Sequence, residues 1–331
     1  MTTSIQSLFS CSDYLYVIFT YCDLKTIGRL CITNQTAYNC TTNNLIKTLI
    51  DKKNQQYIQR ITDEFLQMNT NLKYPLSKIS NIDILNELLK REYDPSVNNN
   101  EAIVDACIGG HLKIVIRLLQ DSRVNPADRN NHAIILASQF NHFDIVNCLL
   151  EDPRVNPAAQ NNAAIIRASY FGHLKIVNRL LEDVRVNPAD KNNEAIIEAC
   201  TRSHLNVLNR LLEDPRVSPD ACRNKPIIEA SRWGNLECVI RLLEDERVSP
   251  DDQSNLAITE ASYYGHLEVV NRLLLDSRVN PTDKNNIAIT MANYGRRFNV
   301  IERLLQDERV INSLSLDERN TFLVRIRDWK R

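Results

Sequence analysis

Apolar residues recur along the chain in short groups that have the spacing of a helix. In residues 173–181 the apolar side chains at Leu174, Ile176, Val177, Leu180 and Leu181 fall on one side of an α-helix. The group returns with a fixed period, which the dipeptide Arg-Val marks at Arg123, Arg154, Arg185, Arg216, Arg247, Arg278 and Arg309. Each of these arginines lies 31 residues after the last, so the period defines seven units: 94–124, 125–155, 156–186, 187–217, 218–248, 249–279 and 280–310.

Nine of the 31 positions hold one residue type in all seven units, and several of them predict local structure. Ile at the tenth position and Ala at the thirteenth lie on one helical face, and the small Ala favours close approach of another helix. Asn at the seventh position precedes this helix, and we expect its side chain to cap the N-terminus. Gly110, Gly172, Gly234 and Gly265 stand at the seventeenth position, which is typical of a helix C-terminus that needs a positive φ.

Each unit therefore predicts a helix, a turn, a second helix and an extended connector. Such a pair of short helices is too small to bury its own apolar face, and stacked neighbours supply the missing partner. We expect an all-α fold, a helical repeat solenoid over residues 94–310 with a small N-terminal helical bundle.

Charge and hydropathy exclude two classes of partner. With 40 Lys and Arg against 41 Asp and Glu the formal charge is -1, whereas a nucleic-acid binder carries a basic excess that neutralises phosphates. No apolar run reaches the roughly 18–20 residues that span a bilayer, and no basic residue precedes the apolar segment 14–19 as in a signal peptide. We expect no nucleic acid, no membrane segment, and a location in the cytoplasm or nucleus.

Chemistry-bearing motifs are missing from the sequence. The nine cysteines include no Cys-x-x-Cys, and the spacing of Cys11, Cys22, Cys31 and Cys40 does not match the paired short gaps of a zinc site. Scattered thiols of this kind fit a reducing compartment. There is no glycine-rich phosphate loop, no His-Glu-x-x-His and no nucleophile motif. We predict no cofactor, no metal and no enzymatic activity.

The segment Ala-Ser-x-x-Gly-His-Leu-x-Ile/Val-Val-x-x-Leu-Leu closely resembles the ankyrin repeat, in which Gly-His-Leu opens the second helix. The His position is occupied by His111, His142, His173, His204 and His266. The resemblance covers roughly residues 94–310, but the period is 31 rather than 33, the Thr-Pro-Leu-His helix start is missing, and Asn mostly replaces the β-turn Gly. Because Asn tolerates the left-handed conformation, we expect the turn to persist. The resemblance implies a scaffold that binds proteins.

Seven of the nine aromatic residues in 94–310 fall at the two positions just before the Gly position: Phe140, Tyr170, Phe171, Trp233, Tyr263, Tyr264 and Tyr294. In ankyrin-like arrays these positions end the first helix and face the concave groove. Aromatic anchors on a rigid surface dominate many interfaces, so we expect a target protein to bind here. The alternative is that some of these rings only pack on the neighbouring unit. Variable positions nearby add a rim of mixed charge: Glu198, Arg202, Glu229, Arg232 and Glu260.

Two further sets of repeated residues invite a chemical interpretation and favour a structural one. The five histidines repeat because the units repeat, so we expect them to be helix starts rather than catalytic or metal-binding groups. The invariant Asp and Arg, such as Asp121 and Arg123, predict ladders of turn hydrogen bonds and exposed ion pairs.

Both flanks of the array predict further helices. Residues 311–331 carry Ser315 and Glu318 at the spacing of a capping box, and a stripe of Leu316, Leu323 and Ile326, so we expect a C-terminal capping helix. Residues 51–93 predict a polar bridging helix followed, over 72–93, by a degenerate opening repeat.

Residues 1–50 follow a different pattern, with helix starts at Ser12 or Asp13 and at Asp23. They resemble an F-box through Asp13, Leu15, Ile18 or Phe19, Asp23, Leu24 and Leu30, although Cys11-Ser12 replaces its Leu-Pro opening. In that family exposed apolar helix faces dock on the adaptor of cullin-RING ubiquitin ligases, which makes Leu15, Ile18 and Leu24 the candidate contacts. The alternative is an irregular helical cap for the array.

Together these features favour a monomeric protein that recruits a target to a cullin-RING ubiquitin ligase. The alternative is a scaffold that binds or sequesters a partner without any link to a ligase. The combination of F-box and ankyrin repeats is similar to ankyrin proteins of large DNA viruses of amoebae, and it also occurs in poxviruses in the reverse order and in intracellular bacteria. A viral protein of this kind would act in the host cytoplasm.

Overall fold

The structure is a computed structural model that describes residues 55–60, 62, 63 and 81–331 of the 331-residue chain. Every regular element in these ranges is a helix, which confirms the predicted all-α solenoid. The chain divides into two units. Of the described residues, the first unit holds 55–60, 62, 63 and 83–93, and the second holds 81, 82 and 94–331. Within the described ranges no helix is long and apolar enough to cross a membrane.

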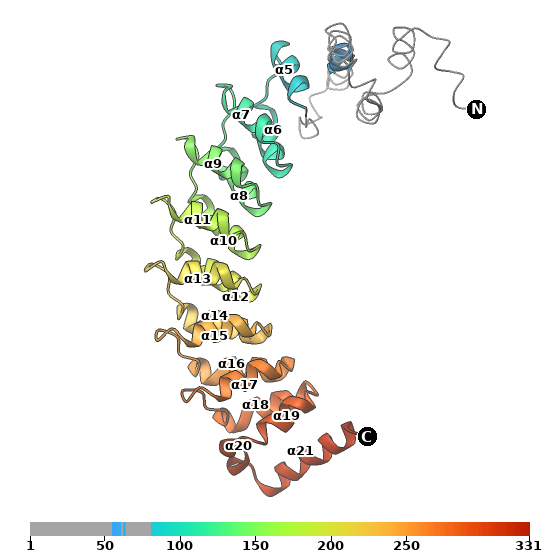
Figure 1. The fold of residues 1–331 in the computed structure, drawn as a ribbon, viewed down its shortest axis with the longest axis vertical. Coiled ribbons are helices and arrows are strands. Elements are labelled where there is room, and N and C mark those ends of the chain that lie inside the picture. The colour runs from blue at the N-terminus through green and yellow to red at the C-terminus, as the bar shows by residue number, and fades with distance from the viewer. Residues whose placement is uncertain (1–54, 61, 64–80) are drawn as a thin grey trace, which may run out of the picture. The chain divides into compact units, whose positions relative to one another are not determined.

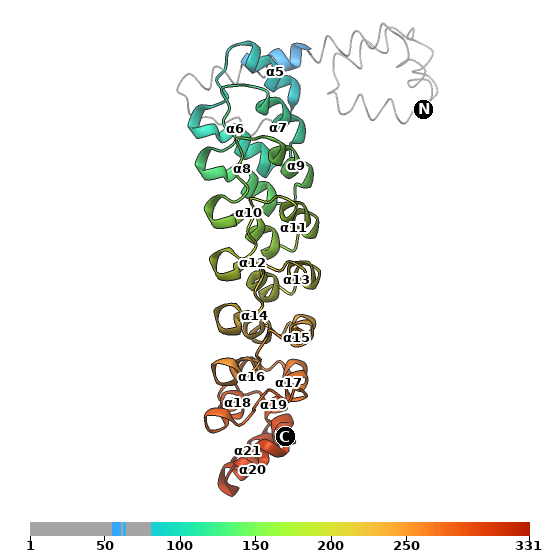
Figure 2. The ribbon, with the colours of Figure 1, turned by 90° about the vertical axis from the view of Figure 1, so that its left-hand side faces the viewer.

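The second unit is a stack of helix pairs that follow one another in chain order (Figure 1). The first helices of the pairs are α6 (Val97–Ile108), α8 (Asp128–Gln139), α10 (Ala159–Tyr170), α12 (Asp190–Thr201), α14 (Ala221–Arg232), α16 (Asp252–Tyr264) and α18 (Asp283–Tyr294). The second helices are α7 (Leu112–Leu119), α9 (Phe143–Glu151), α11 (Leu174–Leu181), α13 (Leu205–Leu212), α15 (Leu236–Leu243), α17 (Leu267–Leu274) and α19 (Phe298–Leu304). First helices run along one side of the stack and second helices along the other (Figure 2).

The core runs through the whole stack without a break. Ile at the tenth position and Ala at the thirteenth are buried in every unit, as the sequence predicted. Each first helix packs on the first helices of its two neighbours, and the Ala at this contact has no side chain beyond Cβ to hold them apart. Burying one such Ile stabilises the stack by roughly 1.5–3 kcal/mol relative to leaving it exposed. The stacking of neighbours therefore supplies the core that a single pair lacks.

Before each first helix the backbone makes a single left-handed turn. Three successive residues have φ between 44° and 63°, as in Gln160, Asn161 and Asn162. The backbone N–H of Asn162 closes the turn by donating to the carbonyl of Ala158 at 3.0 Å. Asn is the side chain that tolerates this conformation best after Gly. The Asn-rich turn that was expected in place of a glycine turn is therefore present.

The invariant Asn at the seventh position does not cap its own helix, so that prediction was wrong. Its side chain points to the next unit instead. In the third unit, Oδ1 of Asn162 accepts from the backbone N–H of Asn187 at 2.8 Å, and Nδ2 donates to Oδ2 of Asp190 at 2.6 Å. The buried side-chain amide of Asn162 thus forms hydrogen bonds with Asn187 and Asp190, which lie 25 and 28 residues later. This Asn fixes the register between units rather than the start of a helix.

The Asp and Arg positions form the predicted ladder along the connectors. Arg185 donates from Nε and from one terminal nitrogen to the two carboxylate oxygens of Asp183, at 2.9 and 2.6 Å. Its other terminal nitrogen donates to the carbonyl of Val155 in the preceding unit at 2.9 Å. The guanidinium hydrogen bond lowers the pKa of Asp183 below its usual value. These arginines hold neighbouring connectors together.

The C-terminal end closes the stack with α20 (Glu308–Ser313) and α21 (Leu316–Trp329). The predicted capping box between Ser315 and Glu318 is present. Ser313 Oγ donates to Oδ1 of Asn286 at 2.6 Å. In the other units the same Asn oxygen accepts from a backbone N–H of the next unit, as Asn162 does from Asn187. The predicted apolar stripe is wrong in part: Ile326 is buried, but Leu316 and Leu323 are exposed, and Phe322 is the second buried side chain.

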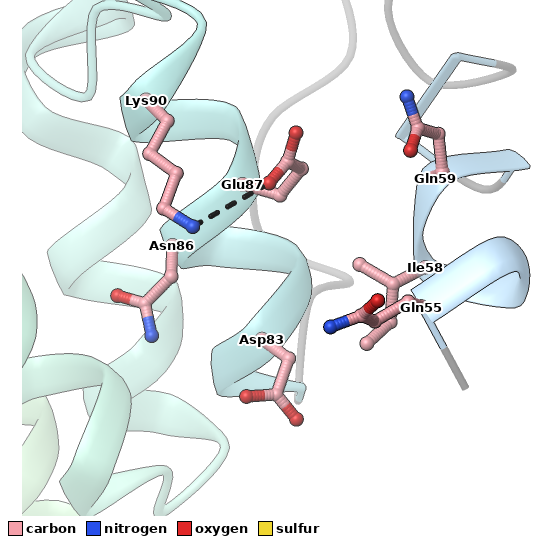
Figure 3. A pocket seen from close by; sticks show the side chains of 7 residues that line it. All are labelled: Gln55, Ile58, Gln59, Asp83, Asn86, Glu87 and Lys90. Carbon is pink, nitrogen blue, oxygen red and sulfur yellow. Dashed lines mark ion pairs between the residues drawn. The ribbon is translucent and has the colours of Figure 1, made fainter. Parts of the chain in front are cut away.

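In the first unit, helical residues 55–60, 62 and 63 are followed by α5 (Ile82–Lys90). Arg91, just after α5, donates to Asp63 at 2.6 Å and to Glu87 at 3.1 Å. Residues 55–59 and α5 line a pocket (Figure 3), and Lys90 pairs with Glu87 on its wall at 3.8 Å. Among the described residues, its lining is polar except for Ile58 and includes no Ser, Thr, Cys or His.

Candidate functional site

The seven aromatic residues singled out in the sequence all lie at the C-terminal ends of first helices or one residue beyond them. We call this set the aromatic edge: Phe140, Tyr170, Phe171, Trp233, Tyr263, Tyr264 and Tyr294. Five of these rings are exposed, from 41% for Phe171 through 59% for Trp233 to 76% for Tyr294. Tyr170 and Tyr263 are half-buried. Most of the aromatic edge is therefore available for contact, and only two rings are substantially covered.

The two half-buried rings connect neighbouring units. The ring of Tyr263 stacks on that of Tyr294, with centroids 6.1 Å apart, and contacts Tyr264 edge-on at 4.8 Å. In the third unit the Tyr170 ring contacts Phe171 at 4.7 Å. The guanidinium of Arg202 lies over the Tyr170 ring, 4.2 Å from its centroid, and donates to its hydroxyl group. These contacts join the third unit to the fourth and the sixth unit to the seventh along the edge.

A turn of fixed geometry follows the aromatic edge in each unit. Gly172 has φ of 77°, and a Cβ at this position would lie 2.5 Å from Nδ1 of His204 in the next unit. Gly is therefore favoured by its backbone conformation and by the lack of room. Gly110 and Gly234 show the same approach of a histidine ring. Asn141 and Ser203 adopt the same positive φ without being Gly.

Four of the five repeated histidines cap the first helix of the preceding unit. Nε2 of His204 donates to the carbonyl oxygen of Tyr170 at 3.0 Å, and Nε2 of His266 donates to that of Arg232 at 2.9 Å. Each accepting carbonyl lies 34 residues earlier, at a helix end where backbone oxygens lack partners. Asn235 and Arg297 replace His in two units and bond to the corresponding carbonyls. The structural role expected for these positions is confirmed, but the capping of a neighbouring unit was missed.

Comparison with known sequences matches the profile "Ankyrin repeats (3 copies)" to residues 76–161 and 165–254, more than half of the chain. The chain belongs to the ankyrin-repeat family. No curated protein matches it. Among solved structures, the human ASB11 ankyrin repeat domain is similar at 20% identity and a TM-score of 0.43, over 57% of this chain and 96% of that domain. Ankyrin repeats are in general non-catalytic scaffolds, and the array is therefore a protein–protein interaction module.

Charged residues flank the aromatic edge of the ankyrin repeats, in the positions that the sequence indicated. Arg232 bridges two carboxylates, with Glu229 of its own helix and Glu260 of the next repeat both 3.1 Å away. Burial raises the pKa of the Glu198 carboxyl, and the nearby charge of Glu194 adds to the rise. The rim therefore combines one compensated cluster, at Arg232, with a carboxylate that is partly removed from water.

A hollow crosses the first helices of three consecutive ankyrin repeats, α8, α10 and α12. Its lining joins Tyr170 of the aromatic edge to side chains of both charges, among them Arg167, Lys191 and Glu198. Because it spans three repeats, such a surface suits an extended chain. It is less suited to a small molecule, because its lining is largely polar and small-molecule sites are mostly apolar.

The residues proposed for the adaptor, Leu15, Ile18 and Leu24, lie outside the described residues, as does the whole segment 1–50. The same holds for Cys11, Cys22, Cys31 and Cys40. The five cysteines in the described ranges are free thiols, and Cys107, Cys200 and Cys238 among them are buried. Burial raises the pKa of Cys238 to about 11, which keeps this thiol protonated at neutral pH.

Proposed function

We propose that the ankyrin array holds a target protein on its aromatic edge while the N-terminal segment docks on the adaptor of a cullin-RING ubiquitin ligase. The observation that carries the first half is the alignment of exposed rings at the same place in five of the seven repeats, with Trp233 59% and Tyr294 76% exposed. Large exposed rings on a rigid surface are the side chains that most often dominate protein interfaces. A purely structural role would leave most of these rings covered.

The rigidity of the array supports this proposal. Every ring except Tyr294 stands at a helix end that the next repeat caps through a His or Arg side chain. A partner therefore meets rings whose backbone positions are already fixed, and it loses little conformational entropy on binding. The chain itself carries out no catalysis in this proposal; any ubiquitin transfer belongs to the ligase.

The second half of the proposal rests on the resemblance of residues 1–50 to an F-box. Simultaneous binding of the adaptor and the target raises the local concentration of the target near the ligase. The contacts proposed for the adaptor are Leu15, Ile18 and Leu24. We also expect the chain to act as a monomer in the cytoplasm or nucleus.

Calorimetry of the full chain with a recombinant adaptor tests the ligase link. We expect micromolar or tighter binding that the double change Leu15→Asp/Ile18→Asp abolishes. The matched control Leu316→Asp/Leu323→Asp places the same charges on exposed leucines of α21 and leaves binding unchanged. Far-UV circular dichroism verifies that both variants keep the helicity of the wild type. If the folded wild type does not bind the adaptor, the chain is a scaffold that holds or sequesters its partner without a ligase.

A further inference from the structure

The aromatic edge is part of a wider surface that carries no carboxylate, which we call the edge region. The edge region consists of the fifteenth to the eighteenth position of every repeat, from Tyr170 to His173 in the third. These 28 positions contain no Asp or Glu. Elsewhere acidic residues are frequent, because 41 of the 331 residues are Asp or Glu. The same 28 positions hold seven aromatic residues, five histidines and four arginines. The composition of the edge region is therefore apolar and basic, although the whole chain has a formal charge of -1.

Three of the four arginines keep a charge that no carboxylate neutralises by an ion pair among the described residues. Arg232 is paired with Glu229 and Glu260 at 3.1 Å. Arg202 lies on the Tyr170 ring, and Arg297 donates to the carbonyl of Tyr263 at 3.0 Å, so both are held in place by groups without a full negative charge. Arg296 is exposed on the turn of the seventh repeat. The positive charge is thus concentrated at the fourth and the seventh repeats.

We propose that the edge region, which includes the aromatic edge and its arginines, binds an extended acidic peptide segment of the target. This segment has apolar or aromatic side chains between its carboxylates. This inference rests on the proposed function and names the kind of partner that the same surface takes. Carboxylates of the peptide pair with Arg202 at one end and with Arg296 and Arg297 at the other. Between them the exposed rings of Trp233 and Tyr264 contact its apolar side chains.

The spacing of the repeats sets the length of this segment. Packed helices lie about 8–10 Å apart, so three steps from the fourth to the seventh repeat cover about 27 Å. An extended chain advances about 3.3 Å per residue, so about eight residues span this distance. The preferred segment therefore has two acidic clusters about eight residues apart.

Single-stranded nucleic acid is the other polymer that suits rings and arginines together. Two observations favour a peptide. The chain lacks the basic excess that nucleic-acid binders use against phosphates. The carboxylates of Glu229 and Glu260 also stand in the fifth and sixth repeats, opposite the apolar middle of the proposed peptide, where a nucleic acid would place further phosphates.

Peptide display on the immobilised full chain tests the proposal and does not require the target to be identified. We expect the enriched members of a random 12-residue library to carry Asp or Glu at both ends and apolar or aromatic residues between them. One enriched peptide, its counterpart with Lys in place of every acidic residue, and a 12-nucleotide oligothymidine are then labelled with fluorescein. Fluorescence anisotropy measures the binding of all three to the full chain.

We expect the acidic peptide to bind, the Lys counterpart to bind at least about tenfold more weakly, and affinity to fall as salt screens the charges. The double change Arg202→Gln/Arg296→Gln weakens binding of the acidic peptide by about tenfold. The control Lys175→Gln removes an exposed charge from α11 and leaves affinity within about twofold.

Several outcomes overturn the inference. Enriched peptides that are basic or show no charge preference, yet lose affinity when Trp233 becomes Ala, refute the acidic partner and leave the protein-binding function standing. Tighter binding of the oligothymidine than of any peptide refutes both. A lack of enriched peptides, with the chain folded on the support, also contradicts both.

Discussion

The invariant Asn at the seventh position offers the sharpest test of how the repeats are held together. Asn162 is 3% exposed and joins the third repeat to the fourth through two hydrogen bonds, one to a backbone N–H and one to the carboxylate of Asp190. The change Asn162→Ala removes both bonds and places Ala at φ of 59°. The left-handed conformation costs Ala about 1 kcal/mol, the neutral bond contributes about 1 kcal/mol, and the bond to the carboxylate about 2 kcal/mol. The expected loss is about 4 kcal/mol.

Asn131 is a matched control in the neighbouring repeat. Its Oδ1 accepts from the backbone N–H of Asn156 at 2.7 Å, but Ala159 stands where the third repeat has an aspartate partner. Asn131→Ala therefore loses the neutral bond and gains the strain, for a loss of about 2 kcal/mol. The difference between the two variants isolates the bond to the carboxylate.

Urea unfolding followed by far-UV circular dichroism compares the two variants with the wild type. Equal denaturant slopes are required, because a changed slope means a changed unfolded state or a loss of cooperativity. We expect Asn162→Ala to lose about twice the free energy of unfolding that Asn131→Ala loses. Equal losses, or losses below about 0.5 kcal/mol in both, would refute the interpretation of this Asn as the link between repeats.

Three further predictions concern the junctions between repeats. Gly172→Ala destabilises the fold by about 1–3 kcal/mol in urea unfolding, because its Cβ meets the ring of His204 and its φ is positive; an unchanged midpoint contradicts this. His204→Ala loses about 1 kcal/mol, since it removes the donor to the Tyr170 carbonyl, whereas His204→Asn keeps most of this stability, as Asn235 does in the next repeat. Stability also falls as the pH is lowered from about 4 to 2, because the Arg123 hydrogen bond holds the pKa of Asp121 at about 2, below its value in the unfolded chain; a flat pH profile of the urea midpoint over this range would count against the ladder.

The repeating core could be predicted from the sequence because each feature of it depends on residues close together in the chain. Ile and Ala three residues apart define a helical face whatever the neighbours do, and Gly172 needs a positive φ for reasons that lie in its own backbone. The direction of the Asn162 side chain was not predictable in the same way. Its partners lie 25 and 28 residues later, and only the stacking distance between repeats brings them within hydrogen-bond range.

In the candidate site, too, the features set by nearby residues were predicted, and the contacts between repeats were not. The aromatic edge was predicted because its rings share two positions of the period, and the structure places each ring at the C-terminal end of a first helix or one residue beyond it. The contact of Arg202 with Tyr170 and the pairing of Arg232 with Glu260 depend on side-chain reach between repeats. At the C-terminus, Leu316 is exposed although it fits an apolar stripe, because α21 buries Phe322 and Ile326 instead.

The aromatic edge as the partner-binding surface is tested most directly by comparing two variants. Trp233→Ala/Tyr264→Ala truncates two exposed rings of the edge, and Leu275→Ala truncates a still more exposed apolar side chain that follows the second helix α17. The binding of the display-selected peptide to each folded full-length variant is measured by fluorescence anisotropy. We expect the double variant to bind at least about tenfold more weakly, which corresponds to about 1.4 kcal/mol or more, and Leu275→Ala to bind like the wild type. Equal affinity of all three proteins would contradict the assignment of partner binding to the aromatic edge.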